Sequence, residues 1–257
     1  PAVVGVALTG SDAAGRAVAA IAGQNLKKAV LELGGSDPFI VLADADIAQA
    51  AQTAVTSRML TSGQTCISAK RFIVEAAIAE AFTAKIEEIV NTLVMGDPMD
   101  EHTTLAPLAS AQFAEQLHQQ VLCSIKTGAK LIIGGDFGPT PFYYQPTILT
   151  NVHPGMPVFD EETFGPVMAV TIAENEEEAV LLANRTGFGL GASIWTTNLL
   201  KARKLTTQIE AGAVFVNSLV KSDPRLPFGG IKQSGLGREL AAYGLREFMN
   251  IKTVWTK

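Results

Sequence analysis

The chain has 257 residues, of which 47% are hydrophobic and 18% are charged, and its formal net charge is −5. This composition is typical of a globular protein, and the length allows one large domain or two smaller ones with a proper core. The acidic balance, the lack of Lys/Arg runs and the lack of an apolar run of membrane-spanning length argue against nucleic-acid and membrane partners. Two cysteines make no disulfide framework and no Cys/His cluster has metal-ligand spacing, so we expect a reducing, cytoplasmic setting and no metal site.

The chain opens directly on a buried-strand pattern at 3–8 without an initiating Met, as a piece of a larger protein would. A turn of small residues follows, and then a helix whose apolar residues repeat at helical spacing. Strand, turn and helix in this order can present backbone N–H groups to a phosphate. An ordinary turn capped by Ser11 or Asp12 fits the same residues, and no full G-x-G-x-x-G motif decides between the two.

Glu32 stands alone in the apolar run 30–33, which ends at a Gly-Gly-Ser turn. A carboxylate in this position is either turned to solvent or held in a cleft with a raised pKa, where it could act as a base. The pattern alone favours the solvated side chain. A further strand at 39–42 follows, and Asp44 and Asp46 then suit the N-terminus of the next helix.

That helix leads to residues 61–68, the segment that carries one of the two cysteines. It reads Thr-Ser-Gly-Gln-Thr-Cys-Ile-Ser, with small and polar residues before Cys66. A reactive thiol needs room around its sulfur and surroundings that favour the thiolate. A lone cysteine is also commonly a small buried apolar residue, and the residues alone leave both interpretations open.

The second half of the chain alternates strands with helices, which predicts an α/β fold with a mainly parallel sheet. One predicted helix carries Cys123 in a core-facing position, and we therefore interpret Cys123 as a packing residue. A glycine-rich loop at 227–239 enters a final helix, and the tail at 251–255 is β-prone. The other predicted elements are strands at 71–74, 130–133, 167–172, 192–196 and 212–216 and helices at 78–93, 108–125, 177–184 and 199–209.

Four motifs occur in a fixed order along the whole chain: Leu-Glu-Leu-Gly-Gly at 31–35, Gly-Gln-Thr-Cys at 63–66, Glu-Glu-Thr-Phe-Gly-Pro-Val at 161–167, and Pro-Phe-Gly-Gly at 227–230 with the glycines after it. Together they resemble the NAD(P)-dependent aldehyde dehydrogenase superfamily. Within it, the cysteine loop, the glycine-rich loop and the tail look most like the succinate-semialdehyde dehydrogenases. The match begins part-way into the family pattern, whose members are roughly twice this length, consistent with two or more domains.

The resemblance implies an aldehyde dehydrogenase-like organisation. Residues 1–33 would be the end of a Rossmann-like NAD(P)-binding domain, 34–245 a parallel-sheet catalytic domain, and 246–257 a C-terminal strand that joins a partner's sheet. A homodimer or a homotetramer is therefore expected. The family's oxyanion-hole asparagine and the residues that choose between NAD and NADP lie upstream of Pro1 in this pattern.

The resemblance also implies a mechanism for oxidising an aldehyde, with succinate semialdehyde as the expected substrate. The Cys66 thiolate would attack the aldehyde carbon to give a thiohemiacetal, whose oxyanion the backbone N–H of Cys66 would help to bind. Hydride transfer to NAD or NADP would leave a thioester. Glu32 would then activate the water that hydrolyses this thioester.

Further roles follow from the same resemblance. Glu162 matches the glutamate that binds the nicotinamide ribose, and Phe164 matches the aromatic residue that packs against that end of the cofactor. The other residues expected at the cofactor, with the serine near the pyrophosphate, are Gly10, Ser11, Leu33 and Gly34.

Substrate residues are expected at Ile67, Ser222 and Phe228, which match positions that line the family's substrate tunnel. A carboxylated aldehyde needs a cation or several donors at its far end. Many succinate-semialdehyde enzymes place an arginine six residues before the cysteine, where this chain has Leu60. Arg58 and Arg225 are the nearby candidates for this task.

Three alternatives are kept open. A thiol hydrolase of the Cys–His type would need a histidine base, and nothing marks any of the three histidines as such a partner. A non-catalytic fragment kept for binding or assembly would explain a match that lacks the upstream half of the pattern. A CoA-acylating or phosphorylating member of the superfamily is disfavoured by Glu32, because a water-activating base is counterproductive when another acceptor takes the acyl group.

Overall fold

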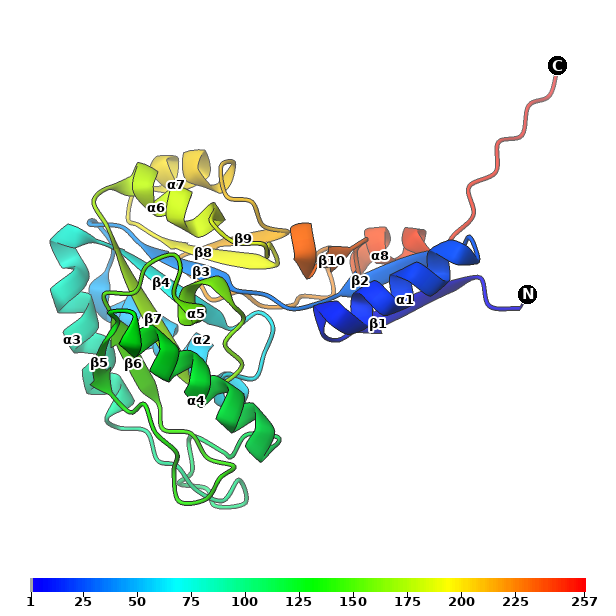
Figure 1. Cartoon of the computed structure of the whole chain (residues 1–257). Coiled ribbons are helices and arrows are strands. Elements are labelled where there is room, and N and C mark those ends of the chain that lie inside the picture. Colours follow the sequence, from blue (N-terminus) through cyan, green and yellow to red (C-terminus); the bar gives the residue numbers. More distant parts are fainter. Residues whose placement is uncertain (1) are drawn as a thin grey trace.

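The computed structural model describes residues 2–257, which build two β-sheets connected by the chain between Glu32 and Asp37 (Figure 1). The larger sheet has seven strands in the order β5-β6-β7-β4-β3-β8-β9, and all neighbours run parallel except β5 and β6. Its strands are β3 (Asp37–Val41), β4 (Ala69–Glu75), β5 (Lys130–Ile133), β6 (Thr147–Thr150), β7 (Val167–Ala173), β8 (Gly191–Trp195) and β9 (Ala213–Val216).

Strand β3, next to the central strand β4, is buried along its whole length because helices cover both faces of the larger sheet. Phe39 faces a core with Phe72 and Phe82, to which α2 and α3 contribute. Ile40 faces the opposite core, formed with residues of α6 and α7. The helices are α1 (Asp12–Gln24), α2 (Ile47–Met59), α3 (Ala79–Val90), α4 (Ala111–Lys126), α5 (Pro157–Asp160), α6 (Glu176–Asn184), α7 (Leu199–Thr206) and α8 (Ala241–Glu247), with short 3-10 turns η1 (Leu60–Gly63), η2 (Ala76–Ile78) and η3 (Lys232–Ser234).

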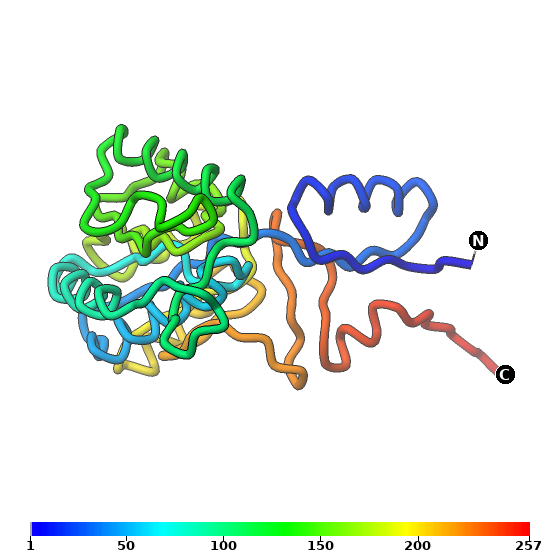
Figure 2. The backbone as a smooth tube through the Cα atoms, turned by 90° about the horizontal axis from the view of Figure 1, so that it is seen from below, coloured from blue at the N-terminus to red at the C-terminus, as the bar shows by residue number. Residues whose placement is uncertain are grey.

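The smaller sheet joins the beginning of the chain to its end. Its strands are β1 (Gly5–Thr9), β2 (Lys28–Glu32) and β10 (Gly235–Leu236); β2 pairs in parallel with β1 and antiparallel with β10. Figure 2 shows α1 beside this sheet, with both chain ends on the same side of the molecule. The mainly parallel α/β architecture expected from the sequence is confirmed, whereas the boundaries between domains stay a prediction.

The interpretation of Cys123 as a packing residue is wrong, because its side chain is exposed. The buried stripe of α4 consists of Ala114, Leu117, Val121 and Ser124, at spacings of three and four residues. Cys123 lies two positions after Val121, about 200° further around the helix axis, and therefore on the solvent side.

The predicted C-terminal strand is not formed in the single chain: 248–257 has no assigned strand, and Figure 1 shows the tail leaving the body of the molecule. Ile251 is 95% exposed and Trp255 is 85% exposed. A strand needs a hydrogen-bonded neighbour, and the residues described supply none to this segment. Its role in oligomerisation stays a prediction. Within 2–257, none of the helices combines the length and the apolar character needed to traverse a lipid bilayer.

Candidate active site

Three loops that are distant in sequence meet at one edge of the larger sheet. The Gly-Gly-Ser turn precedes β3, the Cys66 loop precedes β4, and the segment 161–166 precedes β7. Because β3, β4 and β7 are parallel neighbours, the amino ends of these strands lie together. Glu32 ends β2 of the smaller sheet two residues before the same turn, so the junction of the two sheets gathers the predicted site.

The Cys66 loop is shaped by an unusual turn at the end of α2. Thr61 and Ser62 have φ angles of 52° and 54°, and Gly63 has a φ of 77°, all in the left-handed region that costs most residues energy. A Cβ atom at Gly63 would collide with the backbone carbonyl of Gly165, so the two loops touch through backbone alone. This turn ends the helix and leaves Cys66 half-buried before β4.

Glu162 lies against the glycine turn. Its Oε1 atom accepts a hydrogen bond of 3.0 Å from the backbone N–H of Gly35. A Cβ atom at Gly34 would approach Oε2 of Glu162, and one at Gly35 would lie 2.8 Å from the carbonyl oxygen of Cys66. The turn therefore fits between the carboxylate and the thiol loop only because both residues are glycines.

Lys70 is a member of this site that the sequence analysis missed. It is completely buried, and its Nζ atom donates to the carbonyl oxygens of Cys66, Thr65 and Ser68 at 2.8, 3.2 and 3.3 Å. Nζ also lies 3.6 Å from Oε1 of Glu162. Burial lowers the pKa of Lys70, and Glu162 opposes that shift. The available signal was a lysine placed at the start of an apolar strand, where an unpaired charge is costly.

The charges around Cys66 shift the pKa of its thiol. Burial raises the pKa of the Cys66 thiol, and the ammonium group of Lys70 opposes that rise. The carboxylates of Asp37 and Glu162 raise this pKa further. The thiolate at this position therefore depends on a positive charge nearby.

Glu32 is buried, with an exposed fraction of only 4%, so the solvated side chain favoured by the sequence pattern is wrong. The reason is tertiary: Gly10 of the β1–α1 turn donates to the Glu32 carbonyl at 3.0 Å, and β10 pairs along the other edge of β2. Neither carboxylate oxygen has a hydrogen-bond partner among residues 2–257. Burial, with a smaller contribution from Glu239, raises the pKa of Glu32 to about 8, while Arg238 opposes it.

The turn at Gly10 and Ser11 opens α1, as the sequence suggested. The Ser11 hydroxyl oxygen accepts a hydrogen bond of 3.2 Å from the Ala14 N–H, so the serine caps this helix. Both Gly10 and Ser11 are exposed, and Gly10 is tied to Glu32 by the backbone bond described above. The capping role is observed, and contact with a pyrophosphate remains a prediction.

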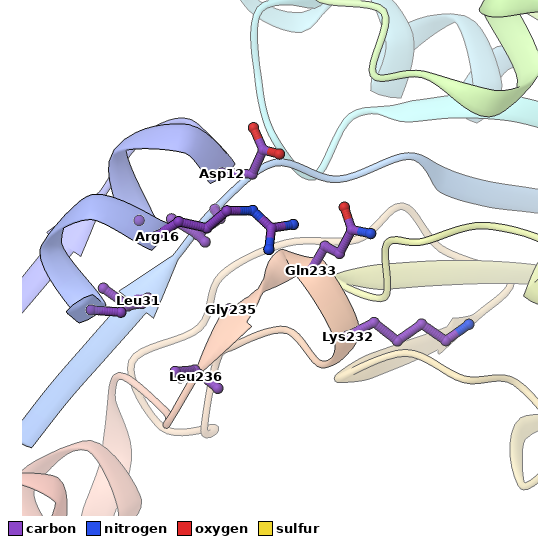
Figure 3. Close-up of a pocket in the computed structure, with 10 residues that line it drawn as sticks. Asp12, Arg16, Leu31, Lys232, Gln233, Gly235 and Leu236 are labelled. Atoms are coloured by element: carbon purple, nitrogen blue, oxygen red, sulfur yellow. The ribbon is translucent and has the colours of Figure 1, made fainter. Parts of the chain in front are cut away.

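A cavity of about 200 Å³ lies between α1 and η3 (Figure 3). Arg16 projects into it from α1, and Gln233 from η3. The lining includes Leu33, one of the predicted cofactor residues, but neither Cys66 nor Glu32. This cavity is therefore separate from Cys66 and Glu32.

Phe164 and the predicted substrate residues differ in burial and in their contacts. Phe164 is half-buried, with its ring edge-on to Phe113 at 6.4 Å between centroids. Phe228 is half-buried and pairs through its backbone with Glu239, and a Cβ atom on the adjoining Gly229 would lie 2.7 Å from Oε1 of Glu32. The two remaining substrate residues are a half-buried Ile67, next to Cys66, and an exposed Ser222, which no hydrogen bond within 2–257 joins to the others.

The two candidate arginines are committed to other partners. Arg58 is completely buried, and its guanidinium group donates to the Ser68 hydroxyl at 3.0 Å and to the carbonyl oxygens of Ala69, Thr163 and Gly165. It ties the Cys66 loop to the Glu162 loop, so the expectation that it receives a substrate carboxylate is wrong. Arg225 has a side chain that is 85% exposed and forms an ion pair of 2.6 Å with Asp223.

Fold and site define an α/β protein in which a thiol loop and the Glu162 carboxylate contact one glycine turn. The chain belongs to the aldehyde dehydrogenase family, whose family model matches residues 1–254.

Similar proteins agree with this assignment. The chain is 50% identical over 254 residues to an NAD(P)+ succinate semialdehyde dehydrogenase of Escherichia coli, covering 98% of this chain and 55% of that protein. An NADP+ succinate-semialdehyde dehydrogenase of Mycobacterium ulcerans is 49% identical, with coverages of 99% and 56%. The crystal structure of succinic semialdehyde dehydrogenase from Streptococcus pyogenes with NADP+ superposes with a TM-score of 0.95 at 42% identity, covering 98% and 56%. The chain thus spans about half the length of the curated relatives it matches.

The contact at Gly63 generates a test. Gly63→Ala places a methyl group against the Gly165 carbonyl and retains a left-handed φ, so it should lower the free energy of unfolding by more than about 1 kcal/mol and change the rate at which Cys66 is alkylated. Gly23→Ala is the matched control, because nothing lies within 4 Å of its Cβ position in α1. Chemical denaturation should show unchanged or slightly raised stability for the control. Equal behaviour of the two variants would contradict the proposed loop contact.

Proposed function

We propose that this protein is an NAD(P)-dependent aldehyde dehydrogenase that oxidises succinate semialdehyde to succinate. The observation that carries the proposal is Glu32, a buried carboxyl without a hydrogen-bond partner among 2–257, which ends β2 two residues before the turn that contacts the Cys66 loop. Its pKa of about 8 suits a base that works near neutral pH. The names of the relatives from Escherichia coli and Mycobacterium ulcerans support the aldehyde and the cofactor.

In this proposal Cys66 is the nucleophile. Its thiolate attacks the aldehyde carbon, and its backbone N–H donates to the oxyanion that forms. After the hydride has left the thiohemiacetal carbon, the acyl group remains on Cys66 as a thioester. Glu32 takes a proton from the water that attacks this thioester, and the carboxylate product and the free thiol are released.

The chain's own residues fit a nicotinamide cofactor. Oε1 of Glu162 is held by the Gly35 N–H and Lys70, and the side chain is still 24% exposed, so the carboxylate can accept ribose hydroxyl groups. Phe164 would pack against the nicotinamide end, and Gly34 and Leu33 would line the cofactor site. A bound NAD(P)+ supplies the hydride acceptor.

The competing chemistries lack support within the residues described. His118 contacts the Tyr144 hydroxyl at 3.2 Å and His153 the carbonyl of Pro154 at 3.2 Å, and no hydrogen bond within 2–257 connects a histidine with Cys66. A Cys–His hydrolase therefore has no base at hand.

We further propose a cytoplasmic protein that forms a homodimer or homotetramer through the tail at 246–257.

Removal of the thiol tests the nucleophile. Cys66→Ala should abolish the aldehyde-dependent formation of reduced cofactor, because no thiohemiacetal can form. Cys123→Ala is the matched control: this exposed cysteine lies on α4 and should leave the rate unchanged. The absorbance of reduced cofactor reports both. Activity that survives Cys66→Ala would refute the assigned nucleophile.

The base is tested by its substitution and by pH. Glu32→Gln should leave an initial burst of reduced cofactor but slow the later turnovers, because acylation no longer leads to hydrolysis. In the unsubstituted protein only the ionised carboxylate takes up a proton. Its pKa is raised to about 8, so the rate of thioester hydrolysis, which follows the burst and does not involve ionisation of the free thiol, should increase about tenfold per pH unit below 8 and level off above it. Stopped-flow absorbance separates burst from turnover, and normal turnover by Glu32→Gln would show that another group is the base.

A further inference from the structure

Lys70 is a charged residue in a place where packing alone would favour an apolar one. Its side chain is fully buried, although transferring an ammonium group from water is costly unless it is paired and hydrogen-bonded. All three carbonyl oxygens that accept its hydrogen bonds belong to the loop around Cys66. The ammonium group therefore binds the backbone of the loop that carries Cys66.

The surroundings of this ammonium group come from four elements. Glu162 faces it from the loop before β7, Asp37 from β3 and Arg58 from α2, and Cys66 lies in the loop that Lys70 holds. Asp37 is buried, its Oδ1 accepts from the Gly191 N–H at 3.0 Å, and burial raises its pKa to about 6 while Lys70 lowers it. Lys70 thus interacts through its charge with two carboxylates and the thiol.

One of its hydrogen bonds acts on the peptide group of the nucleophile itself. The Thr65 carbonyl and the Cys66 N–H are the two ends of one planar peptide unit. A cation that binds the carbonyl oxygen polarises that unit and makes its N–H a stronger donor. Lys70 lies 3.2 Å from the Thr65 oxygen, so this effect reaches the N–H that would bind the oxyanion.

We propose that Lys70 is a positioning residue of the thiol site: its ammonium group fixes the Cys66 loop against Glu162, polarises the Thr65–Cys66 peptide and supplies positive charge to the thiolate. The inference rests on the proposed function, in which Cys66 is the nucleophile. It adds a residue that acts through the thiol loop and touches neither the substrate nor the reacting atoms.

The pH dependence of thiol alkylation tests this role. The probe is iodoacetamide, and every variant also carries Cys123→Ser, because the exposed second cysteine would react as well. Lys70→Met removes the positive charge that opposes burial, Asp37 and Glu162, so the midpoint of the Cys66 alkylation profile should move to higher pH. Glu162→Gln removes one of the carboxylates, so the midpoint should move to lower pH.

Arg71→Met is the matched control. Arg71 is the next residue of β4 and is equally buried, but it donates to the carbonyl oxygens of Ser36, Leu182 and Ala183 instead of the Cys66 loop. It should lower stability and leave the midpoint where it is. Lys70→Gln, which keeps two N–H donors for the carbonyls without the charge, serves if Lys70→Met fails to fold. It should also move the midpoint to higher pH.

The outcomes separate the two proposals. An unmoved midpoint in a folded Lys70 variant, an equal shift in Arg71→Met, or no shift in Glu162→Gln would each overturn the role of Lys70. Alkylation needs neither aldehyde nor cofactor, so such a result would leave the aldehyde dehydrogenase activity standing. Conversely, a protein that reduces no cofactor could still show the predicted shifts, to higher pH in Lys70→Met and to lower pH in Glu162→Gln. That result would retain the Lys70–Cys66 coupling and refute the proposed reaction.

Discussion

The contact between Glu162 and the turn at Gly34 and Gly35 is the constraint on which the site depends. It brings a carboxylate within hydrogen-bond distance of a backbone N–H and leaves the Cys66 carbonyl on the other side of the same turn. Side chains on the turn would separate all three segments. Because the loops precede parallel neighbouring strands, the order of the sheet holds them in register. In open α/β sheets ligands usually bind at the carboxyl ends of the strands, whereas these loops lie at the amino ends of β3, β4 and β7. The carboxyl end of a strand is supplied here by the second sheet, whose strand β2 ends at Glu32.

Buried cations maintain this arrangement. Arg58 and Lys70 are both inaccessible to solvent, and each directs its donors at backbone carbonyl oxygens of the loops around the site. Charge-assisted bonds to carbonyl groups offset the cost of burial and hold irregular backbone, which lacks the regular hydrogen bonds of helices and strands. Glu32, by contrast, has no hydrogen-bond partner among residues 2–257, and its raised pKa is the consequence of a junction that buries a carboxyl without supplying a donor.

The sequence predicted the parts of this protein that depend on local pattern. Alternating strands and helices predicted the α/β sheet, and four motifs taken together predicted family membership, which the family model confirms. Contacts between distant segments were not accessible in this way. The burial of Glu32 depends on β10, some two hundred residues later in the chain. Arg58 donates a hydrogen bond to the carbonyl oxygen of Thr163, which is more than one hundred residues away in sequence. Cys123 was misplaced by a shift within one helical turn.

The measurement that tests the account most directly is the absorbance of reduced cofactor with succinate semialdehyde and with a neutral aldehyde of similar length, each with NAD+ and NADP+. The account predicts cofactor reduction with strong preference for the carboxylated aldehyde. Equal or better use of the neutral aldehyde would contradict the succinate assignment, and the absence of reduction with every aldehyde would contradict the enzyme itself.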